Sequence, residues 1–232
     1  MISSHWIRGL VLSTGLLCGL ALAKDTSEPT KWLSQVKIQA LSDTVPPPPA
    51  PNSADDQADL ALILKAQKSR TPEIEAECKR DEGFSYKLFQ SIYGTALTPE
   101  HNPKFFQLMK DVLDVSHVVN KTAKNNYHRP RPYQGHPDTV KALFTVGEFS
   151  YPSGHSMGSF TLAVVLSEVF PDKKPAFLNR AAQIAQSRVD AGVHYPSDIK
   201  EGEVLGKATA AALLANSSFQ SDLAAVKEEV KK

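Results

Sequence analysis

The stretch that decides the fold runs from Pro103 to Asn120 and reads PKFFQLMKDVLDVSHVVN. Its apolar side chains recur at intervals of three and four residues, at Phe105, Leu108, Met109, Val112, Val115 and Val119. This spacing places them on one face of an α-helix, and a proline at the start suits a first helical turn. The stretch is therefore predicted to be an amphipathic helix packed against a core.

Helical signals also flank this stretch on both sides. Upstream, a charge-rich helical segment is predicted over 58–82 and a short helix over 84–93. Downstream, helices are predicted over 156–170, 176–189 and 199–215, followed by a last charged helix. The sequence contains no alternating strand pattern, no hairpin signal and no internal repeat. The fold class predicted is all-α, a single-domain helical bundle.

Length and charge limit the classes of function. The chain has 232 residues, enough for one domain with a sizeable core, and its formal net charge is +1. A protein that binds nucleic acid through its overall field is strongly basic, so no nucleic-acid partner is expected. If the substrate is an anion, it must be attracted by locally placed cations.

Residues 1–23 have the pattern of a secretory signal peptide. Arg8 precedes an apolar run from Leu10 to Ala23, and Ala21-Leu-Ala23 is a small-x-small cleavage site. A membrane anchor is the alternative, but a run of about 14 residues is too short to span ~30 Å of hydrocarbon. We therefore expect cleavage after Ala23, a periplasmic protein and no membrane span after cleavage. Cys78 is then the one remaining cysteine, so no intramolecular disulfide is expected.

Residues 24–56 are polar and proline-rich, with four consecutive prolines from Pro46 to Pro49. Polyproline continues neither a helix nor a sheet, so this segment is predicted to be an extended arm. The domain itself is predicted to occupy residues 57–232.

A first cluster of cationic residues directly follows the predicted helix that ends near Asn120. Lys124 and Arg131 lie seven positions apart, in a loop stiffened by Pro130 and Pro132. Two cations on a stiff turn suit a phosphate oxyanion, which arginine can bind with two parallel hydrogen bonds. A solvated basic turn, or cations complementing the helix end, is the alternative for this cluster alone.

A second cluster, Tyr151-Pro-Ser-Gly-His-Ser156, precedes an apolar helix. Ser153 is a suitable N-cap and Gly154 allows close approach of the backbone. Free amide groups at a helix start attract an anion, beside which His155 would project. An ordinary capped helix with a surface histidine is the alternative.

A third cluster, Ser187-Arg-Val-Asp-Ala-Gly-Val-His-Tyr-Pro-Ser-Asp198, precedes the next predicted helix. Pro196 suits the first turn, which places His194 just before the helix and Asp198 within it. Asp198 could then accept a hydrogen bond from one imidazole nitrogen and leave the other nitrogen free to attack. Arg188 would add a phosphate-binding cation. A helix-start carboxylate near an unrelated histidine is the alternative.

Taken together, the three clusters read Lys124-x6-Arg131-Pro132, Pro152-Ser153-Gly154-His155 and Ser187-Arg188-x5-His194-x3-Asp198. This pattern resembles the signature of the type 2 phosphatidic acid phosphatase (PAP2) superfamily, which also contains vanadium haloperoxidases. All signature positions are present, separated by residues 133–151 and 156–186. The signal peptide and the proline-rich arm resemble those of bacterial class A non-specific acid phosphatases, and this likeness covers essentially the whole mature chain.

The resemblance implies a helical phosphatase and a role for each signature residue. His194 would be the nucleophile that takes the phosphoryl group, Asp198 would orient it, and His155 would be the general acid. The phosphate would be bound by Lys124, Arg131, Ser153, Gly154 and Arg188. Small phosphate monoesters are the expected substrates, with no cofactor and no metal. An acidic optimum is expected if His155 is protonated while His194 is neutral.

Other functions share parts of this residue set. A vanadium haloperoxidase would use the same residues, because vanadate mimics the phosphoryl transition state. A soluble lipid-phosphate phosphatase would differ only in its leaving group. A periplasmic phosphate-binding protein would need the cations but not the paired histidines. The signature binds only the phosphate, so the leaving group is left open; it is expected to contact loops such as 135–151. A homodimer is possible, since relatives form dimers.

Overall fold

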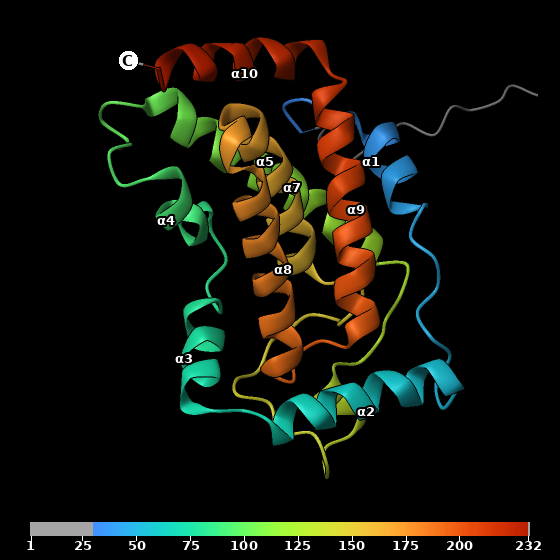
Figure 1. The fold of residues 1–232 in the computed structure, drawn as a ribbon. Helices are drawn as coiled ribbons and strands as arrows, with labels where there is room; N and C mark the ends of the chain where they lie inside the picture. The colour runs from blue at the N-terminus through green and yellow to red at the C-terminus, as the bar shows by residue number, and fades with distance from the viewer. Residues whose placement is uncertain (1–29, 232) are drawn as a thin grey trace, which may run out of the picture.

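The structure is a computed structural model that describes residues 30–231. Over these residues the chain forms helices and no strand, which confirms the all-α prediction (Figure 1). The helices are α1 Gln35–Ser42, α2 Ala54–Lys68, α3 Pro72–Arg80, η1 Tyr86–Phe89, α4 Gln90–Tyr93, α5 Pro103–Lys124, α6 Pro132–Gly135, α7 Gly154–Val169, η2 Pro171–Lys173, α8 Lys174–Asp190, α9 Pro196–Leu214 and α10 Ser217–Glu229.

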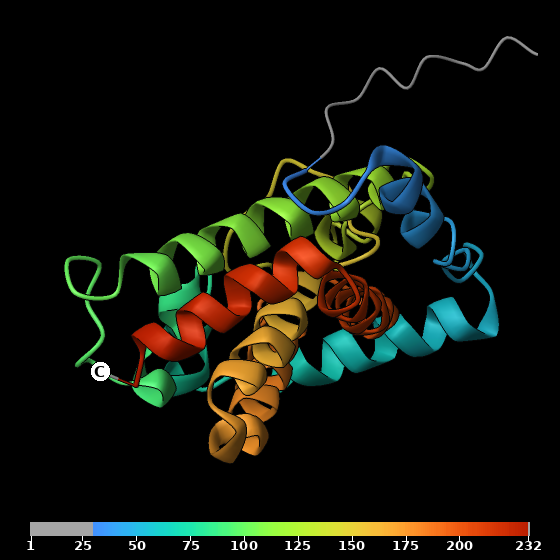
Figure 2. The ribbon, with the colours of Figure 1, turned by 90° about the horizontal axis from the view of Figure 1, so that it is seen from above.

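Four long helices form the body of the molecule. The apolar helix α7 is the central one; it packs against α8, α9 and α5. Figure 1 shows α7, α8 and α9 side by side, with α10 crossing one end of the bundle and α2 crossing the other. Seen from above in Figure 2, α5 and α10 lie next to each other along one side. The ends of α5 and α8 and the starts of α7 and α9 therefore meet at the end of the bundle that α2 crosses.

Two glycines let α9 approach α7 at backbone distance. A Cβ atom at Gly206 would lie 2.3 Å from the carbonyl oxygen of Met157, and one at Gly202 would lie 2.6 Å from that of Ser153. No side chain fits in either place. This contact fixes the start of α7, which carries the second sequence cluster, against the first half of α9.

The sequence pattern located the long helices well. The helix predicted from Pro103 is α5, with the proline in its first turn, although it continues to Lys124. Ser153 caps α7 as predicted, because its hydroxyl accepts a hydrogen bond from the amide of Ser156. Pro196 lies in the first turn of α9 as predicted. The segment predicted as one helical stretch over 58–82 is instead two helices, α2 and α3.

The segment predicted to be extended is partly helical. Ser34 caps α1, whose Ile38 and Leu41, together with Trp32 and Leu33 just before the helix, are buried in the main core. Trp32 lies edge-on to Phe219 of α10, with the two ring centroids 5.0 Å apart. Its indole nitrogen donates a hydrogen bond of 3.0 Å to Asp222. Burial of this apolar face explains the helix, because helical stability in proteins comes mostly from tertiary packing.

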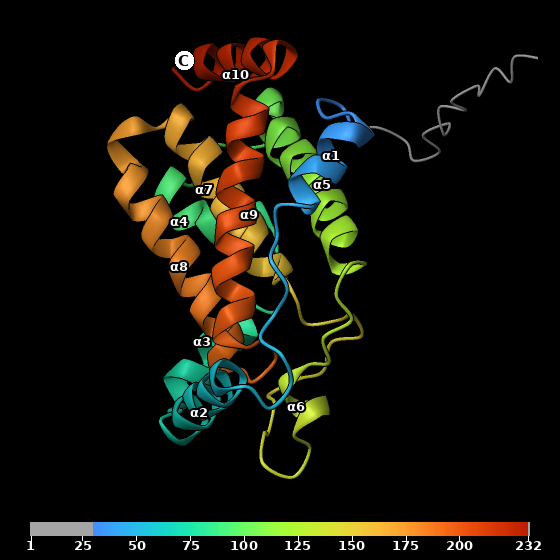
Figure 3. The same cartoon turned by 90° about the vertical axis from the view of Figure 1, so that its right-hand side faces the viewer.

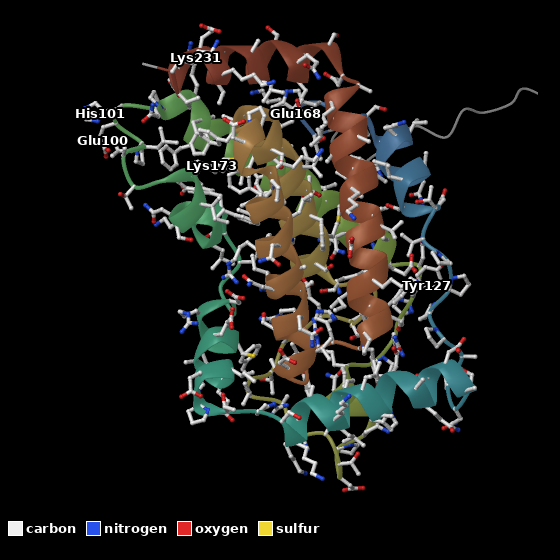
Figure 4. All side chains as sticks on the ribbon, in the orientation of Figure 1. Glu100, His101, Tyr127, Glu168, Lys173 and Lys231 are labelled. Atoms are coloured by element: carbon white, nitrogen blue, oxygen red, sulfur yellow. The ribbon has the colours of Figure 1, made fainter. Side chains whose placement is uncertain are left out.

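Between α1 and α2, residues 46–50 have no regular structure, as expected for consecutive prolines. Two tyrosine hydroxyls hold this linking segment. Tyr127 donates to the carbonyl of Val45 at 2.8 Å, and Tyr151 donates to that of Pro46 at 2.7 Å. Figure 4 shows Tyr127 beside this segment. Tyr151 precedes α7, so the link between α1 and α2 is bonded to the same loop that leads into the second cluster.

The predicted signal peptide, residues 1–23, lies outside the described part of the chain. None of the helices within residues 30–231 is both long enough and apolar enough to cross a membrane.

Candidate active site

All three sequence clusters meet at one end of the bundle. Lys124 ends α5, Ser153 to His155 start α7, Arg188 lies in the last turn of α8, and Asp198 lies in the first turn of α9. The loops between α5 and α7 pass beneath these helix ends (Figure 3). A cavity of about 450 Å³ opens there. Six of its lining residues belong to the sequence signature: Lys124, Arg131, Gly154, His155, Arg188 and His194.

The two nitrogens of His194 have different partners. Nδ1 lies 3.2 Å from Oδ2 of Asp198, and Nε2 lies 3.0 Å from a guanidinium nitrogen of Arg131. Arginine has no acceptor, so Nε2 must be the unprotonated nitrogen and Nδ1 carries the proton that is donated to Asp198. Burial, followed by the nearby charge of Arg131, lowers the pKa of His194 well below its usual range. His194 is therefore a neutral imidazole with a lone pair on Nε2.

Asp198 is fully buried and accepts hydrogen bonds on both oxygens. Oδ2 accepts from the amide of Tyr195 at 2.8 Å and from the hydroxyl of Ser150, besides His194. Oδ1 accepts from Arg129 at 2.8 Å. Burial raises the pKa of Asp198, and the positive charge of Arg129 opposes that rise. These donors leave the carboxylate a single orientation, which sets the ring of His194.

Three cations surround His194 and are held by main-chain carbonyls. Lys124 donates to the carbonyl of Phe149, Arg131 donates to those of Glu148 and Val193 at 2.7 and 2.8 Å, and Arg188 donates to that of Asp81 at 3.2 Å. Within residues 30–231, none of the three cations pairs with a carboxylate. Burial, followed by repulsion from Arg131, lowers the pKa of Lys124 to about 8 and that of Arg188 to about 10. Their charges are therefore available to an anion in the cavity.

The start of α7 forms another wall of the cavity. Ser153 is fully buried, and a Cβ atom at Gly154 would lie 3.0 Å from the side-chain oxygen of Asn120. His155 follows, with Nε2 3.0 Å from the carbonyl oxygen of Glu82. Burial, followed by the charge of Arg188, lowers the pKa of His155 to about 3. The protonated His155 expected from the sequence is therefore not favoured, because the ring is buried and lies near the charges of Arg188 and Arg131.

One face of α5 lines the outer part of the cavity. Leu113, Ser116, His117 and Asn120 lie on this face, and Phe84 lies among the other lining residues. The loop expected to contact the leaving group contributes Val146 and Glu148. No role was predicted for His117, because it belongs to none of the three sequence clusters. His128 does not line this cavity; its ring packs against Phe149 with centroids 4.6 Å apart.

Several polar residues that lie behind the site were not predicted from the sequence. Arg129 is within the first cluster and Ser150 just before the second, yet neither was chosen as functional. Asp59 of α2 reaches the start of α9, where it accepts a hydrogen bond from the amide of Ser197 at 3.1 Å. In the described part of the chain, no group of three or more histidine, cysteine, aspartate or glutamate side chains is arranged to bind a metal.

A buried neutral imidazole, an orienting carboxylate and three unpaired cations around one cavity match the signature read from the sequence. The family model described as the PAP2 superfamily matches residues 112–221, which contain every signature residue. Over this stretch the chain is similar to the PAP2 superfamily. It is an enzyme, a phosphatase.

Comparison with individual proteins gives the same class. A non-specific acid phosphatase of Providencia stuartii is 26% identical over 235 residues, which cover 97% of this chain and 95% of that protein. The fold is similar to a PAP2-type phosphatidylglycerolphosphate phosphatase of Bacillus subtilis, with a TM-score of 0.52, 25% identity and coverage of 75% of this chain and 89% of that one. A bacterial vanadium-dependent iodoperoxidase shares the fold at a TM-score of 0.59 with 19% identity, covering 78% of this chain and 54% of that one.

Proposed function

We propose that this protein is a secreted acid phosphatase that hydrolyses phosphate monoesters through a phosphohistidine intermediate. The observation that carries the proposal is the state of His194: its Nδ1 proton is donated to Asp198, and its Nε2, which accepts from Arg131, belongs to a residue that lines the same cavity as three cations. An imidazole in this state is a nucleophile whose second nitrogen is oriented by a carboxylate.

The first half of the reaction transfers the phosphoryl group to His194. Nε2 attacks phosphorus, and the bond between phosphorus and the ester oxygen breaks. Arg131, Arg188 and Lys124 stabilise the charge that spreads over the phosphoryl oxygens, which is the main contribution that a protein makes to this chemistry. The leaving alkoxide takes a proton that the substrate monoanion has passed to His155. Asp198 stabilises the positive charge that develops on His194.

The second half releases phosphate. His155, now neutral, removes a proton from water, which attacks phosphorus; the P–N bond breaks and its electron pair returns to Nε2. Inorganic phosphate leaves with the proton that His155 took from water, and both histidines are again neutral. The signature residues touch only the phosphoryl group, so we propose a broad range of monoesters as substrates.

The proposal of secretion rests on the sequence of residues 1–23. Expression of the full chain in a bacterium with an outer membrane should release a periplasmic protein whose amino-terminal sequence begins at Lys24. An unprocessed chain in the cytoplasm would contradict it.

The activity is tested by hydrolysis of p-nitrophenyl phosphate at pH 5–6, with EDTA present and with or without vanadate. We expect activity that survives EDTA and is inhibited by vanadate. Rapid quenching with labelled substrate should trap a phosphoenzyme that is stable in alkali and labile in acid, and His194→Ala should lose both the phosphoenzyme and turnover. A His194→Ala enzyme with a near wild-type rate would refute the mechanism.

Three further assays on the same protein distinguish the alternative functions. Bromide oxidation by the vanadate-loaded protein without esterase activity would indicate a haloperoxidase. Hydrolysis confined to lipid phosphates would indicate a lipid-phosphate phosphatase. Stoichiometric binding of phosphate without turnover would indicate a binding protein.

A further inference from the structure

The guanidinium group of Arg129 lies behind the proposed active site and is almost fully buried. One of its terminal nitrogens donates to Oδ1 of Asp198 at 2.8 Å and to the hydroxyl of Ser197 at 2.7 Å. The other donates to Asp56 and to Asp59 of α2, both at 3.0 Å. A single side chain therefore connects the carboxylate that orients His194 with a helix that begins 144 positions earlier in the chain than Asp198.

A second set of contacts ties α2 directly to the start of α9. Asp59 accepts hydrogen bonds from the amide and the hydroxyl of Ser197, next to Asp198 in the chain. The plane of Arg129 also stacks on the ring of Tyr195, with 3.8 Å between its central carbon and the ring centroid. The first turn of α9 is thus held on one side by α2 and on the other by Arg129.

In the cluster formed by Arg129, Asp56, Asp59 and Asp198, the cation is neutralised by ion pairs, unlike the cations in the cavity. Arg129 pairs with three carboxylates, whereas Lys124, Arg131 and Arg188 pair with none in the described part of the chain. A cation that is neutralised in this way contributes little to binding an anion. Its planar fork instead fixes the positions of several acceptors at once, which lysine does not do.

We propose that Arg129 is a positioning residue: it holds Asp198, and through it His194, against a support provided by Asp59 and Asp56 of α2. The inference rests on the proposed function, in which His194 is the nucleophile. It extends the working site beyond residues 112–221, which match the PAP2 family, to a helix outside that match.

The decisive variants replace the guanidinium group of Arg129 and leave the residues that line the cavity unchanged. Arg129→Gln should lower kcat about 10- to 100-fold, the usual effect of losing a residue that orients a functional ligand from behind. The KM for p-nitrophenyl phosphate should change little, because the cations in the cavity are retained. Arg129→Lys should recover only part of the rate, and added guanidinium should recover part of the rate of Arg129→Ala.

The pH profile provides a readout that a purely structural role would not change. Asp198 faces Arg129, His194, the hydroxyl of Ser150 and the amide of Tyr195, with the charges of Lys124 and Arg131 further away. Without Arg129, Asp198 should bind a proton at higher pH, so the acidic limb of kcat/KM should move to higher pH. Asp59→Asn keeps the cation, so it should lower kcat less and should not move this limb upward.

Asp222→Asn is the matched control. Asp222 also joins segments distant in sequence, since it accepts a hydrogen bond from Trp32 and pairs with Lys31, but it lies on α10 at the other end of the bundle. Its loss should lower the midpoint of thermal unfolding without altering kcat or the pH profile.

Two outcomes would overturn the inference. Folded Arg129→Gln and Asp59→Asn enzymes with the wild-type kcat and pH profile would show that the cluster has no role in positioning. A loss in Arg129→Gln confined to KM would show that Arg129 acts by binding substrate. Failure of the proposed function has a different signature, because the wild-type enzyme itself would then form no phosphohistidine.

Discussion

The imidazole of His155 is held by the main-chain carbonyl of Glu82, whose oxygen lies 3.0 Å from Nε2. A carbonyl oxygen only accepts hydrogen bonds, so Nε2 carries the proton of the neutral ring. Burial, followed by the charge of Arg188, lowers the pKa of His155 to about 3. His155 is therefore neutral across most of the acidic range, and the proton for the leaving group must arrive with the substrate.

This arrangement predicts how activity depends on pH. A phosphate monoester loses its second proton near pH 6. We expect kcat/KM to fall above about this pH, because only the monoanion brings a proton into the site. The test is to measure the profile with two aryl phosphates that differ in their second pKa. The alkaline limb should follow the substrate; a limb at the same pH for both would assign the proton to the free enzyme.

Arg188 should contribute mainly to the transition state. Its Nε is buried and has no hydrogen-bond partner in the described part of the chain, so it is a donor already in place for an incoming oxygen. Arg188→Ala should lower kcat by about 10²- to 10³-fold, as removal of a preorganised oxyanion donor does. Arg188→Lys should not restore the rate, because lysine lacks the fork. Measuring kcat and KM separately tests whether Arg188 acts in the transition state. A change in KM alone would show that Arg188 contributes only to binding the substrate in its ground state.

The wall formed by α5 predicts a preference for the leaving group. Leu113 and Phe84 give the outer cavity apolar surface. Leu113→Ala should lower kcat/KM for p-nitrophenyl phosphate about tenfold, the value of a few buried methylene groups, and should change glycerol phosphate much less. Leu62→Ala, at an exposed position on α2, is the control and should leave the ratio unchanged. Equal losses on both substrates in Leu113→Ala would contradict this role.

The contact between α7 and α9 predicts a loss of stability. In Gly206→Ala the new methyl group would meet the backbone of Met157, so the two helices must separate. Overpacking of this kind costs about 1–3 kcal/mol in the free energy of unfolding, measured in urea. Gly147→Ala, whose Cβ would meet nothing within 4 Å, should change stability by less than about 0.5 kcal/mol. Similar stabilities for the two variants would show that α7 and α9 can separate at no cost.

Most of the fold could be predicted because its long helices have local causes. The apolar spacing after Pro103 and the cap at Ser153 act within a few residues, and both helices occur where they were expected. Helix α1 was missed because only eight residues form it and its stability comes from burial against α5 and the core. The apolar spacing of eight residues next to a run of prolines does not distinguish a short helix from an extended segment.

The candidate site could be predicted only in part, and for the same reason. The signature residues are separated by fixed spacings, and the structure brings six of them to the wall of one cavity. The contact between Asp59 and Ser197 joins positions 138 apart, so no local spacing reveals it. The low pKa of His155 comes from its burial and from the nearby charges of Arg188 and Arg131, and these act only once the chain is folded.

Trp32, held edge-on to Phe219 and bonded to Asp222, has a practical consequence. It is the one tryptophan among residues 24–232, and it is buried where the start of the described chain meets α10. Its fluorescence emission will therefore report the docking of that segment, at the end of the bundle away from the cavity. Unfolding can be followed by the emission of Trp32 while turnover is measured separately. Each variant therefore contains an intrinsic fluorescence probe of its own folding.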